Sequence, residues 1–443
     1  MYGLHTDLYQ LTMAAGYFQA GKVREKATFE LFLRRLPWNR NFAVAAGLAQ
    51  AVDYLLSLSF TPQEVDYLRG LPQFRQAPSG FFDALLSLRF TGDVWAVPEG
   101  TPVFAGEPLM TVRAPILESQ IAETYLLATI GFQSLIATKA ARVAEAACGR
   151  GVVEFGTRRA HSPEAGMYAG RAAYIGGCVG TSNVEAGHRF GIPVFGTAAH
   201  SWVQSFASER DAYVELQKLL GDATIYLIDT YDTLEGARLA ASLGRPVWGV
   251  RLDSGNLVEL SRQVRAILDE ADLGDVKIMA TGDLNEYKIL ELVAADTPID
   301  TFGVGTELAT SADAPTLGAV YKLVELESNG VRRYTAKFSA DKHTMPSSKQ
   351  VFRYAGRDEV ACAWEEPSGA ATPLLKPVIR DGELAEPLPD ATAARSHATR
   401  SLAQLPKACR SLFPMEEPYL VTYTPELQRL LEHARQGHAG AMV

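Results

Sequence analysis

The 443-residue sequence predicts an α/β protein, an irregular (β/α) barrel with an additional α+β domain built from the N-terminal and C-terminal segments. Between residues 150 and 310, six short apolar runs are each followed by a glycine-rich or polar tip and then by a helical stretch. Apolar runs that alternate with helices are typical of parallel strands joined by right-handed crossovers. We expect domains at 1–120, 121–320 and 321–443, the last packing back on the first. An open doubly wound sheet is the alternative to the barrel.

The first domain mixes helices with strands. Apolar residues recur at helical spacing after a polar start, and the run ATFELFL alternates like a strand. The expected elements are a helix over 2–20, a strand over 27–33, a helix over 43–58, a small β-rich unit over 90–117, and a long helix over 118–147 interrupted at Gly131.

The central domain supplies the strands of the barrel. They are expected at 151–155, 193–195, 224–228, 247–250, 277–280 and 299–304. In a barrel, the loops at the carboxyl ends of the strands build the active site together. We therefore expect one site from the six tips FGTRRAH, FGTAAHSW, DTYDT, VRLDSGN, TGDLNE and GVGTEL.

The C-terminal segment returns to β structure, with strands in AVYKLVELES, VRRYTAKFS and KQVFRY. The stretch 366–395 is rich in Pro, Ala and Gly and is expected to wrap the surface. Thr424 and Pro425 predict the N-cap and first residue of a helix over 424–435. The basic loop 337–349 either is solvated or brings Lys349 to bound phosphates.

Composition argues against several classes of protein. The net charge of −9 repels nucleic-acid phosphates, and no apolar run approaches the ~18 residues of a membrane span. The start MYGLHTDLYQLTMA lacks the features of a secretory signal. The four cysteines are too scattered for a disulfide framework or a zinc knuckle. We expect a cytoplasmic protein that binds neither nucleic acid nor membrane.

Two neighbouring tips have the residues of a phosphate and ribose site. Gly303, Gly305 and Thr306 follow the last strand, where backbone N–H groups can approach a phosphate. Gly282 and Asp283 follow the preceding strand and fit the same neighbourhood. Ordinary tight turns between strand and helix are the alternative.

Charged residues follow two other strands. Arg251 and Asp253 are two apart and therefore point the same way, so that the arginine can bind a carboxylate or phosphate and the aspartate can accept from ribose hydroxyls or hold Mg²⁺. A structural ion pair between them is the alternative. Of the adjacent Arg158 and Arg159, only one is expected to face the site.

A histidine and a carboxylate end adjacent tips. Asp229 is placed to fix the tautomer of His200, which leaves the other ring nitrogen as base or nucleophile; a structural histidine is the alternative. No histidine spacing supports a zinc cage. No tip carries a lysine, since Lys277 opens its strand, which argues against Schiff-base chemistry, and there is no P-loop motif.

Ten blocks of sequence together resemble the nicotinate phosphoribosyltransferase family, in order and over nearly the whole chain. They are TDLYQLTMAAGY, FLRRLPWNRNFAVAAGL, EFGTRRAHS, GTSNV, GTAAHSWV, IDTYDT, GVRLDSGNL, TGDLNE, FGVGTEL and SSKQVFR. The resemblance implies a type II phosphoribosyltransferase, a homodimer with active sites at the subunit interface. The implied reaction joins nicotinate to phosphoribosyl pyrophosphate and gives nicotinate mononucleotide and pyrophosphate for NAD synthesis. ATP hydrolysis is coupled to it through a phosphohistidine, and Mg²⁺ is bound mainly through the pyrophosphate rather than by a side-chain cage.

The resemblance also implies a role for individual residues. His200 matches the phosphorylated histidine, Asp229 its orienting carboxylate, Arg251 the arginine that reaches the carboxylate of nicotinate, and Asp253 the ribose contact. The substrate-binding positions implied are Tyr9, which stacks on the pyridine ring from the partner subunit, Phe155 on the opposite face, Arg158 at the pyrophosphate, Thr181 and Ser182 in the GTSNV block, and Gly282, Asp283, Gly303, Gly305 and Thr306 around the 5′-phosphate and ribose.

Two alternatives to this function remain open. The related nicotinamide phosphoribosyltransferase has an aspartate in the block where this chain has Ser182, and an aspartate would repel the carboxylate of nicotinate. Serine therefore favours the acid over the amide as substrate. A non-catalytic nucleotide-sensing homologue is the other alternative; it predicts loss of His200, Asp229 or Arg251, and all three are present.

Overall fold

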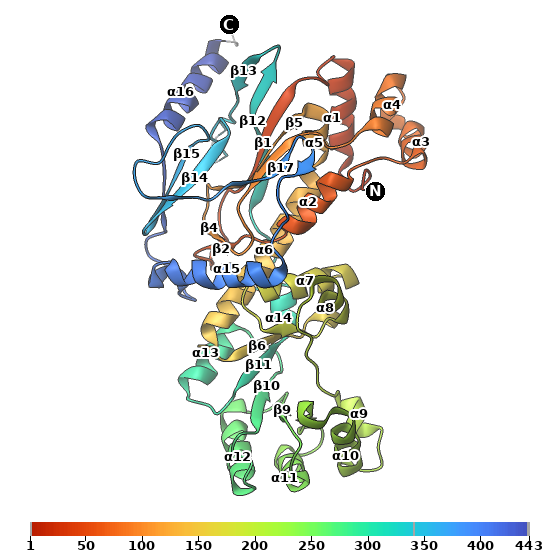
Figure 1. Cartoon of the computed structure of the whole chain (residues 1–443), viewed down its shortest axis with the longest axis vertical. Coiled ribbons are helices and arrows are strands. Elements are labelled where there is room, and N and C mark those ends of the chain that lie inside the picture. Colours follow the sequence, from red (N-terminus) through yellow and green to blue (C-terminus); the bar gives the residue numbers. More distant parts are fainter. Residues whose placement is uncertain (1, 340–341, 441–443) are drawn as a thin grey trace. The chain divides into compact units, whose positions relative to one another are not determined.

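The computed structural model describes residues 2–339 and 342–440, with side chains through residue 436 (Figure 1). The chain forms two compact units. The first comprises Met1–Leu135, Thr316–Pro389 and Arg400–Val443, and the second comprises Ile136–Pro315 and Asp390–Thr399. The divisions thus lie near 135 and 315, where the sequence predicts 120 and 320. Within the described ranges, no helix has the length and apolar character needed to span a bilayer.

A seven-stranded sheet organises the first unit, in the order β13-β12-β1-β5-β3-β17-β18. Its strands are β1 (Lys26–Leu33), β3 (Asp93–Ala96), β5 (Pro108–Pro115), β12 (Ala319–Ser328), β13 (Val331–Tyr334), β17 (Lys376–Arg380) and β18 (Glu383–Leu384). β1 pairs antiparallel with β5 on one side and β12 on the other, and its side chains are almost all buried. The N-terminal and C-terminal segments of the chain therefore share one sheet, as the predicted α+β domain requires.

Smaller elements complete this unit. They are the sheet β16-β14-β15-β19, with β14 (Lys349–Tyr354), β15 (Arg357–Cys362), β16 (Thr372–Pro373) and β19 (Leu420–Tyr423); the pair β2 (Ala43–Val44) and β4 (Pro102–Val103); and the helices α1 (Leu8–Gln19), α2 (Leu48–Ser57), α3 (Pro62–Gly70), α4 (Ser79–Ser87), α5 (Ile116–Ile121) and α16 (Pro425–Gly440). Thr424 Oγ1 accepts from Leu427 N at 3.3 Å, which confirms the predicted N-cap of α16.

Three helices differ from the sequence-based expectation. α1 begins only after Asp7, whose φ and ψ are extended. The helix expected from residue 43 begins at Leu48, because Gly47 adopts φ 97° and a Cβ there would lie 2.9 Å from the carbonyl oxygen of Thr129. The long helix over 118–147 is divided between α5 and α6 (Glu123–Ala146), and the predicted interruption at Gly131 lies inside α6.

The second unit contains a parallel six-stranded sheet in the order β7-β6-β11-β10-β9-β8. Figure 1 labels its strands β6, β11, β10 and β9. Its strands are β6 (Gly151–Glu154), β7 (Gly180–Thr181), β8 (Ile225–Leu227), β9 (Gly249–Leu252), β10 (Lys277–Ala280) and β11 (Thr301–Val304). The last strand of the chain order, β11, pairs with the first, β6, which is the cyclic order of a barrel. The predicted irregular barrel is confirmed.

The irregularity lies at one place in the ring. The segment expected as a strand at 193–195 forms only a parallel bridge, between Val194 and Thr181 of β7. Within the described residues, no ladder joins that segment to β8. The helices of this unit alternate with its strands and are the second part of α6, α7 (Pro163–Ile175), α8 (Val184–Phe190), α9 (His200–Gln204), α10 (Glu209–Leu220), α11 (Thr233–Leu243), α12 (Leu257–Glu270), α13 (Glu286–Ala294) and α14 (Thr306–Ala309), with α15 (Ala391–Gln404) divided between the two units.

Candidate functional site

Arg251, on β9, is the centre of a hydrogen-bonded network at the carboxyl ends of the barrel strands. Its Nε donates to Thr281 Oγ1 at 2.8 Å, Nη1 donates to Thr197 Oγ1 at 2.7 Å, and Nη2 donates to Asp253 Oδ1 at 2.6 Å. Only 13% of its side chain is exposed. These contacts fix the plane of the guanidinium and with it the direction of its remaining donor.

Asp253 is the carboxylate of this network. Its Oδ1 accepts from Arg251 and from the hydroxyl of Thr281, and its Oδ2 lies 3.6 Å from His200 Nε2. Burial alone would raise the pKa of Asp253, but the Thr281 hydrogen bond and the Arg251 charge outweigh burial and lower the pKa. The group is therefore a carboxylate at neutral pH. The ion pair with Arg251 that the sequence left open as an alternative is present.

His200 is the first residue of α9. Its Nδ1 lies 3.1 Å from Thr230 Oγ1, while Nε2 faces Asp253. The imidazole thus has a hydroxyl within hydrogen-bonding distance of one nitrogen and faces a carboxylate with the other, and 41% of its side chain is accessible to solvent. A histidine so exposed is open to reaction with a ligand, unlike a buried structural histidine.

Asp229, the predicted partner of His200, has other contacts in this structure. Its Oδ2 accepts from the backbone N–H of Asp253 at 2.9 Å and from Ser254 Oγ at 2.7 Å. Its Oδ1 is buried and has no hydrogen-bond partner among the described residues. Asp229 therefore holds the loop that carries Asp253, and Thr230 occupies the place at the imidazole that was predicted for Asp229. A direct role of Asp229 toward His200 stays a prediction.

Two of the predicted glycines allow close approach between neighbouring tips. A Cβ at Gly303 would lie 2.7 Å from the Phe155 ring and 2.6 Å from Thr281 Cγ2. Gly282 has φ 90°, and a Cβ there would lie 1.9 Å from the carbonyl oxygen of Asp253. These close contacts explain why glycine is required at both positions, independently of any ligand. They also place Phe155 against the end of β11.

Thr181, predicted to bind substrate, is fully buried. Its hydroxyl donates to Glu154 Oε2 at 2.6 Å and accepts from Asn183 N at 3.0 Å. Glu154 is itself buried at the end of β6, and desolvation raises its pKa against the hydrogen bonds from Thr181 and the N–H of Gly156. Ser182 is half-buried and its N–H donates to the carbonyl of Glu154 at 2.9 Å. Thr181 thus shapes the loop, and Ser182 is the better placed of the two to meet a ligand.

The remaining predicted residues are exposed or half-buried in the two units. In the barrel unit, Arg158 and Asp283 are exposed, Gly305 precedes α14, and Thr306 is exposed as its first residue. Tyr9 belongs to the first unit, where 50% of it is exposed on α1.

Lys349 has a structural role and is not placed to bind phosphate. It lies in the first unit, buried, with Nζ 2.6 Å from Glu30 Oε2 and donating to the carbonyl of Ser347 at 2.7 Å. The suggestion that Lys349 reaches bound phosphates is therefore wrong for this structure, because its charge and donors are already used. Residues 340 and 341 of the same loop lie outside the described residues.

Sequence reasoning missed Thr197, Thr230 and Glu154. Each stands one to three residues from a residue that was singled out, at the end of a strand or in the tip after it. A hydroxyl next to a charged residue at a strand end was the available signal. Among the described residues, no group of three or more His, Cys, Asp or Glu side chains is arranged to hold a metal ion.

The fold and site define a barrel-like α/β protein whose charged network, His200–Asp253–Arg251–Thr281, lies at the carboxyl ends of the strands. Residues 4–131 match the profile of the nicotinate phosphoribosyltransferase (NAPRTase) N-terminal domain, and residues 151–355 match that of the NAPRTase family. The chain belongs to the nicotinate phosphoribosyltransferase family.

Individual relatives match this chain over most or nearly all of its length. The chain is 44% identical to nicotinate phosphoribosyltransferase pncB2 of Mycobacterium tuberculosis, over 99% of this chain and 96% of that protein. It is 45% identical to nicotinate phosphoribosyltransferase of Bacillus subtilis, over 79% of this chain and 72% of that one. The crystal structure of human nicotinic acid phosphoribosyltransferase superposes with a TM-score of 0.85 at 30% identity, covering 97% of this chain and 99% of that one.

Proposed function

We propose that this chain is a cytoplasmic nicotinate phosphoribosyltransferase of NAD biosynthesis. It joins nicotinate to phosphoribosyl pyrophosphate, gives nicotinate mononucleotide and pyrophosphate, and couples this transfer to ATP hydrolysis through phosphorylation of His200. The observation that supports the proposal most directly is the network in which one fixed arginine, one ionised aspartate and one exposed histidine meet within hydrogen-bonding or ion-pair distance.

Arg251 recognises the carboxylate of nicotinate. An arginine has five N–H donors, and hydrogen bonds to Thr281, Thr197, the Ala198 carbonyl and Asp253 use four of them in the described structure. One N–H on Nη2 remains for a ligand. Because the other contacts fix the guanidinium, this donor has a defined direction, which a flexible lysine at the same place would not provide.

Asp253 binds the ribose. When the bond between C1 of the ribose and pyrophosphate breaks, positive charge develops on the sugar, and a nearby carboxylate stabilises it while accepting from the hydroxyls. Its lowered pKa keeps it ionised for this task. The reaction needs positioning and electrostatic stabilisation more than a strong base, in agreement with a network that contains no free lysine or glutamate among its members.

His200 accepts the phosphoryl group from ATP. If Nδ1 donates its proton to Thr230 Oγ1, Nε2 carries the lone pair that attacks the terminal phosphorus. A phosphorus–nitrogen bond forms, the bond from that phosphorus to the bridging oxygen breaks, and ADP leaves. Water later cleaves the phosphorus–nitrogen bond and releases inorganic phosphate.

Mg²⁺ bound to the pyrophosphate would neutralise its charge as it leaves. The buried Asp229 Oδ1, without a hydrogen-bond partner among the described residues, is the side-chain oxygen with capacity to hold such an ion. One carboxylate oxygen fits a cation whose other ligands come from the substrate and water.

A second copy of the chain completes the site in this proposal. Tyr9 and Met13 are exposed on α1, and Gly16 and Ala20 continue the same helical stripe. An exposed apolar stripe that begins with the tyrosine proposed to stack on the pyridine ring is suited to a homodimer.

The proposal is tested by a paired assay with purified protein, phosphoribosyl pyrophosphate and Mg²⁺. Nicotinate or nicotinamide is supplied, each with and without ATP, and mononucleotide and ADP are measured. We expect product from nicotinate, more of it with ATP, and little from nicotinamide. Equal use of both bases would contradict the role given to Ser182. Absence of product from both bases would refute the proposed enzyme activity.

A further inference from the structure

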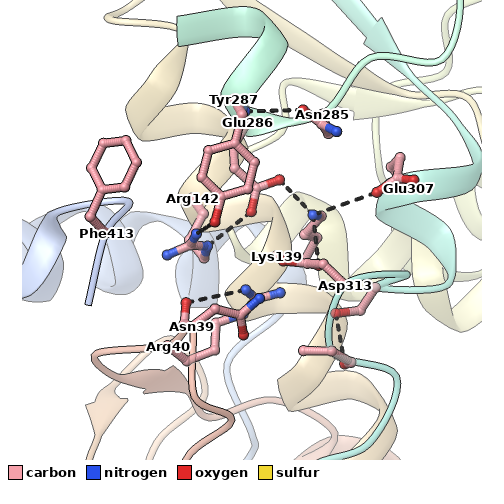
Figure 2. Close-up of polar contacts among 12 residues, drawn as sticks. Asn39, Arg40, Lys139, Arg142, Asn285, Glu286, Tyr287, Glu307, Asp313 and Phe413 are labelled. Atoms are coloured by element: carbon pink, nitrogen blue, oxygen red, sulfur yellow. Dashed lines mark hydrogen bonds and ion pairs between the residues drawn. The ribbon is translucent and has the colours of Figure 1, made fainter.

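Lys139 is a buried lysine on α6 that contacts three carboxylates of the barrel unit (Figure 2). Its Nζ lies 2.5 Å from Glu286 Oε2, 2.8 Å from Asp313 Oδ1 and 3.9 Å from Glu307 Oε2, and only 1% of its side chain is exposed. Arg142, three residues further along the helix, donates to Glu286 Oε1 at 3.0 Å. We call these five residues the Lys139 cluster.

The carboxylates of the cluster come from two different loops. Glu286 opens α13, directly after the loop that follows β10 and contains Gly282 and Asp283. Glu307 lies on α14 and Asp313 soon after it, in the segment that follows β11. β10 and β11 are neighbours in the sheet. One ammonium group therefore joins the two loops that the family resemblance assigns to the ribose and its 5′-phosphate.

Such a cluster is costly if stability is its only role. Removing a lysine and a glutamate from water is unfavourable, and replacing a buried ion pair with apolar residues is often neutral or stabilising. What a buried ion pair supplies is a defined geometry, because each charge must stay with its partner. Here the ion pairs define how far the two loops lie from each other and from the long helix α6.

We propose that Lys139 is a positioning residue for the phosphoribosyl group: it fixes the loops after β10 and β11 relative to each other so that both meet the same sugar phosphate. This inference rests on the proposed function and adds to it a residue that touches neither substrate. If the two loops shift relative to each other, the sugar phosphate is no longer held in the geometry that the reaction needs, and the reaction slows.

The test is Lys139→Met in the full-length protein, with steady-state kinetics for each substrate. We expect the KM for phosphoribosyl pyrophosphate to rise about tenfold or more, while the KM for nicotinate changes less than about twofold. Val143→Ala is the matched control, because Val143 is fully buried one turn further along α6 and its truncation weakens packing without removing any charge of the cluster. If Val143→Ala raises the same KM as much, or Lys139→Met leaves it unchanged, the proposal is wrong.

A second variant separates positioning from stability. In Lys139→Met, Glu286 is left buried with Arg142 as its remaining partner, so the double variant Lys139→Met/Glu286→Gln should recover thermal stability relative to the single one. Its KM for phosphoribosyl pyrophosphate should stay high. Recovery of both together would show that Lys139 acts only through stability.

Amide hydrogen exchange of the ligand-free protein tests the same inference without catalysis. In Lys139→Met, and not in Val143→Ala, exchange should quicken in residues 282–288 and 305–313. If the wild-type protein proves inactive in the paired assay, the proposed function fails while this measurement still decides whether Lys139 holds the two loops. Unchanged exchange in both segments would overturn the positioning role.

Discussion

His200 Nε2 lies 3.6 Å from Asp253 Oδ2, so the residue proposed to accept a phosphoryl group faces the carboxylate proposed to bind ribose. Phosphorylation would place negative charge beside that carboxylate and would strain the pair between Asp253 and Arg251. In the proposed reaction, the phosphorylation step and the transfer step would thereby be connected through one aspartate.

Replacing Arg251 with lysine should raise the KM for nicotinate at least about tenfold, because a lysine cannot keep the Thr281, Thr197 and Asp253 contacts and also present a fixed donor. Steady-state kinetics with varied nicotinate measure this. Arg245→Lys is the control, since Arg245 pairs with Asp275 on the exposed surface. A KM within twofold of wild type would rule out the assigned role.

His200→Ala should abolish nicotinate-stimulated ATP hydrolysis and the acid-labile label from γ-phosphate-labelled ATP, while circular dichroism stays as in wild type. The reason is that the nucleophilic nitrogen is lost from an exposed side chain. His188→Ala, on the exposed face of α8, serves as control. Persistent labelling of His200→Ala would place the phosphorylated residue elsewhere.

Gly282→Ala should lower the free energy of unfolding by about 1–3 kcal/mol from its positive φ alone, and should also reduce activity. The added Cβ would lie 1.9 Å from the carbonyl oxygen of Asp253 and must displace the backbone of Asp253, whose carboxylate is proposed to bind ribose. Gly191→Ala is the matched comparison, because Gly191 has φ 66° but open space where a Cβ would stand. Urea unfolding and kcat of both variants check this; equal effects on kcat would mean that the close contact is unimportant.

Glu154→Gln should make stability less dependent on pH. Burial raises the pKa of Glu154 in the folded protein, so its protonated form is favoured by folding. The favourable contribution is present below the unfolded carboxyl pKa, about 4.3, and is lost as pH rises through the folded pKa. Urea unfolding of both proteins at several pH values should show that the free energy of unfolding of the variant rises relative to that of the wild type as pH rises. A constant difference would argue that Glu154 does not titrate in this way.

Met13→Asp should shift the protein from dimer to monomer, because it places a charge in the apolar stripe of α1. Sedimentation velocity at micromolar concentration measures the change, and activity should fall with it if Tyr9 acts in the partner's site. Leu86→Asp, at an exposed leucine of α4, is the control. An unchanged sedimentation coefficient would exclude this stripe as the interface.

The barrel was predictable because its strands are short apolar runs with chemically distinctive tips. β10 begins and ends at the predicted residues, 277 and 280. β7 was missed because Gly180 and Thr181 form no apolar run, and the 193–195 run has the composition of a strand but forms only one bridge. The apolar pattern of the sequence indicates which segments are buried. It does not indicate which of these segments pair with another strand in a sheet.

The site was predictable to the level of its charged residues. Arg251, Asp253 and His200 meet as expected, whereas the partner of the imidazole is Thr230 in place of its neighbour Asp229. The Lys139 cluster had no signal at all in the sequence, because its members, Lys139, Arg142, Glu286, Glu307 and Asp313, are up to 174 residues apart. Pairings at such separations depend on how the loops pack.

The incomplete ring of the barrel has a consequence for its histidine. His200 follows the segment that bridges to β7 on one side and, among the described residues, has no ladder to β8 on the other. This seam can widen without breaking any strand pairing, since the hydrogen bonds that cross it among the described residues involve side chains such as those of Thr197 and Thr230. Backbone opening should be easiest there, so the phosphorylated ligands proposed to react with the imidazole could enter and leave while the other strand pairings stay intact.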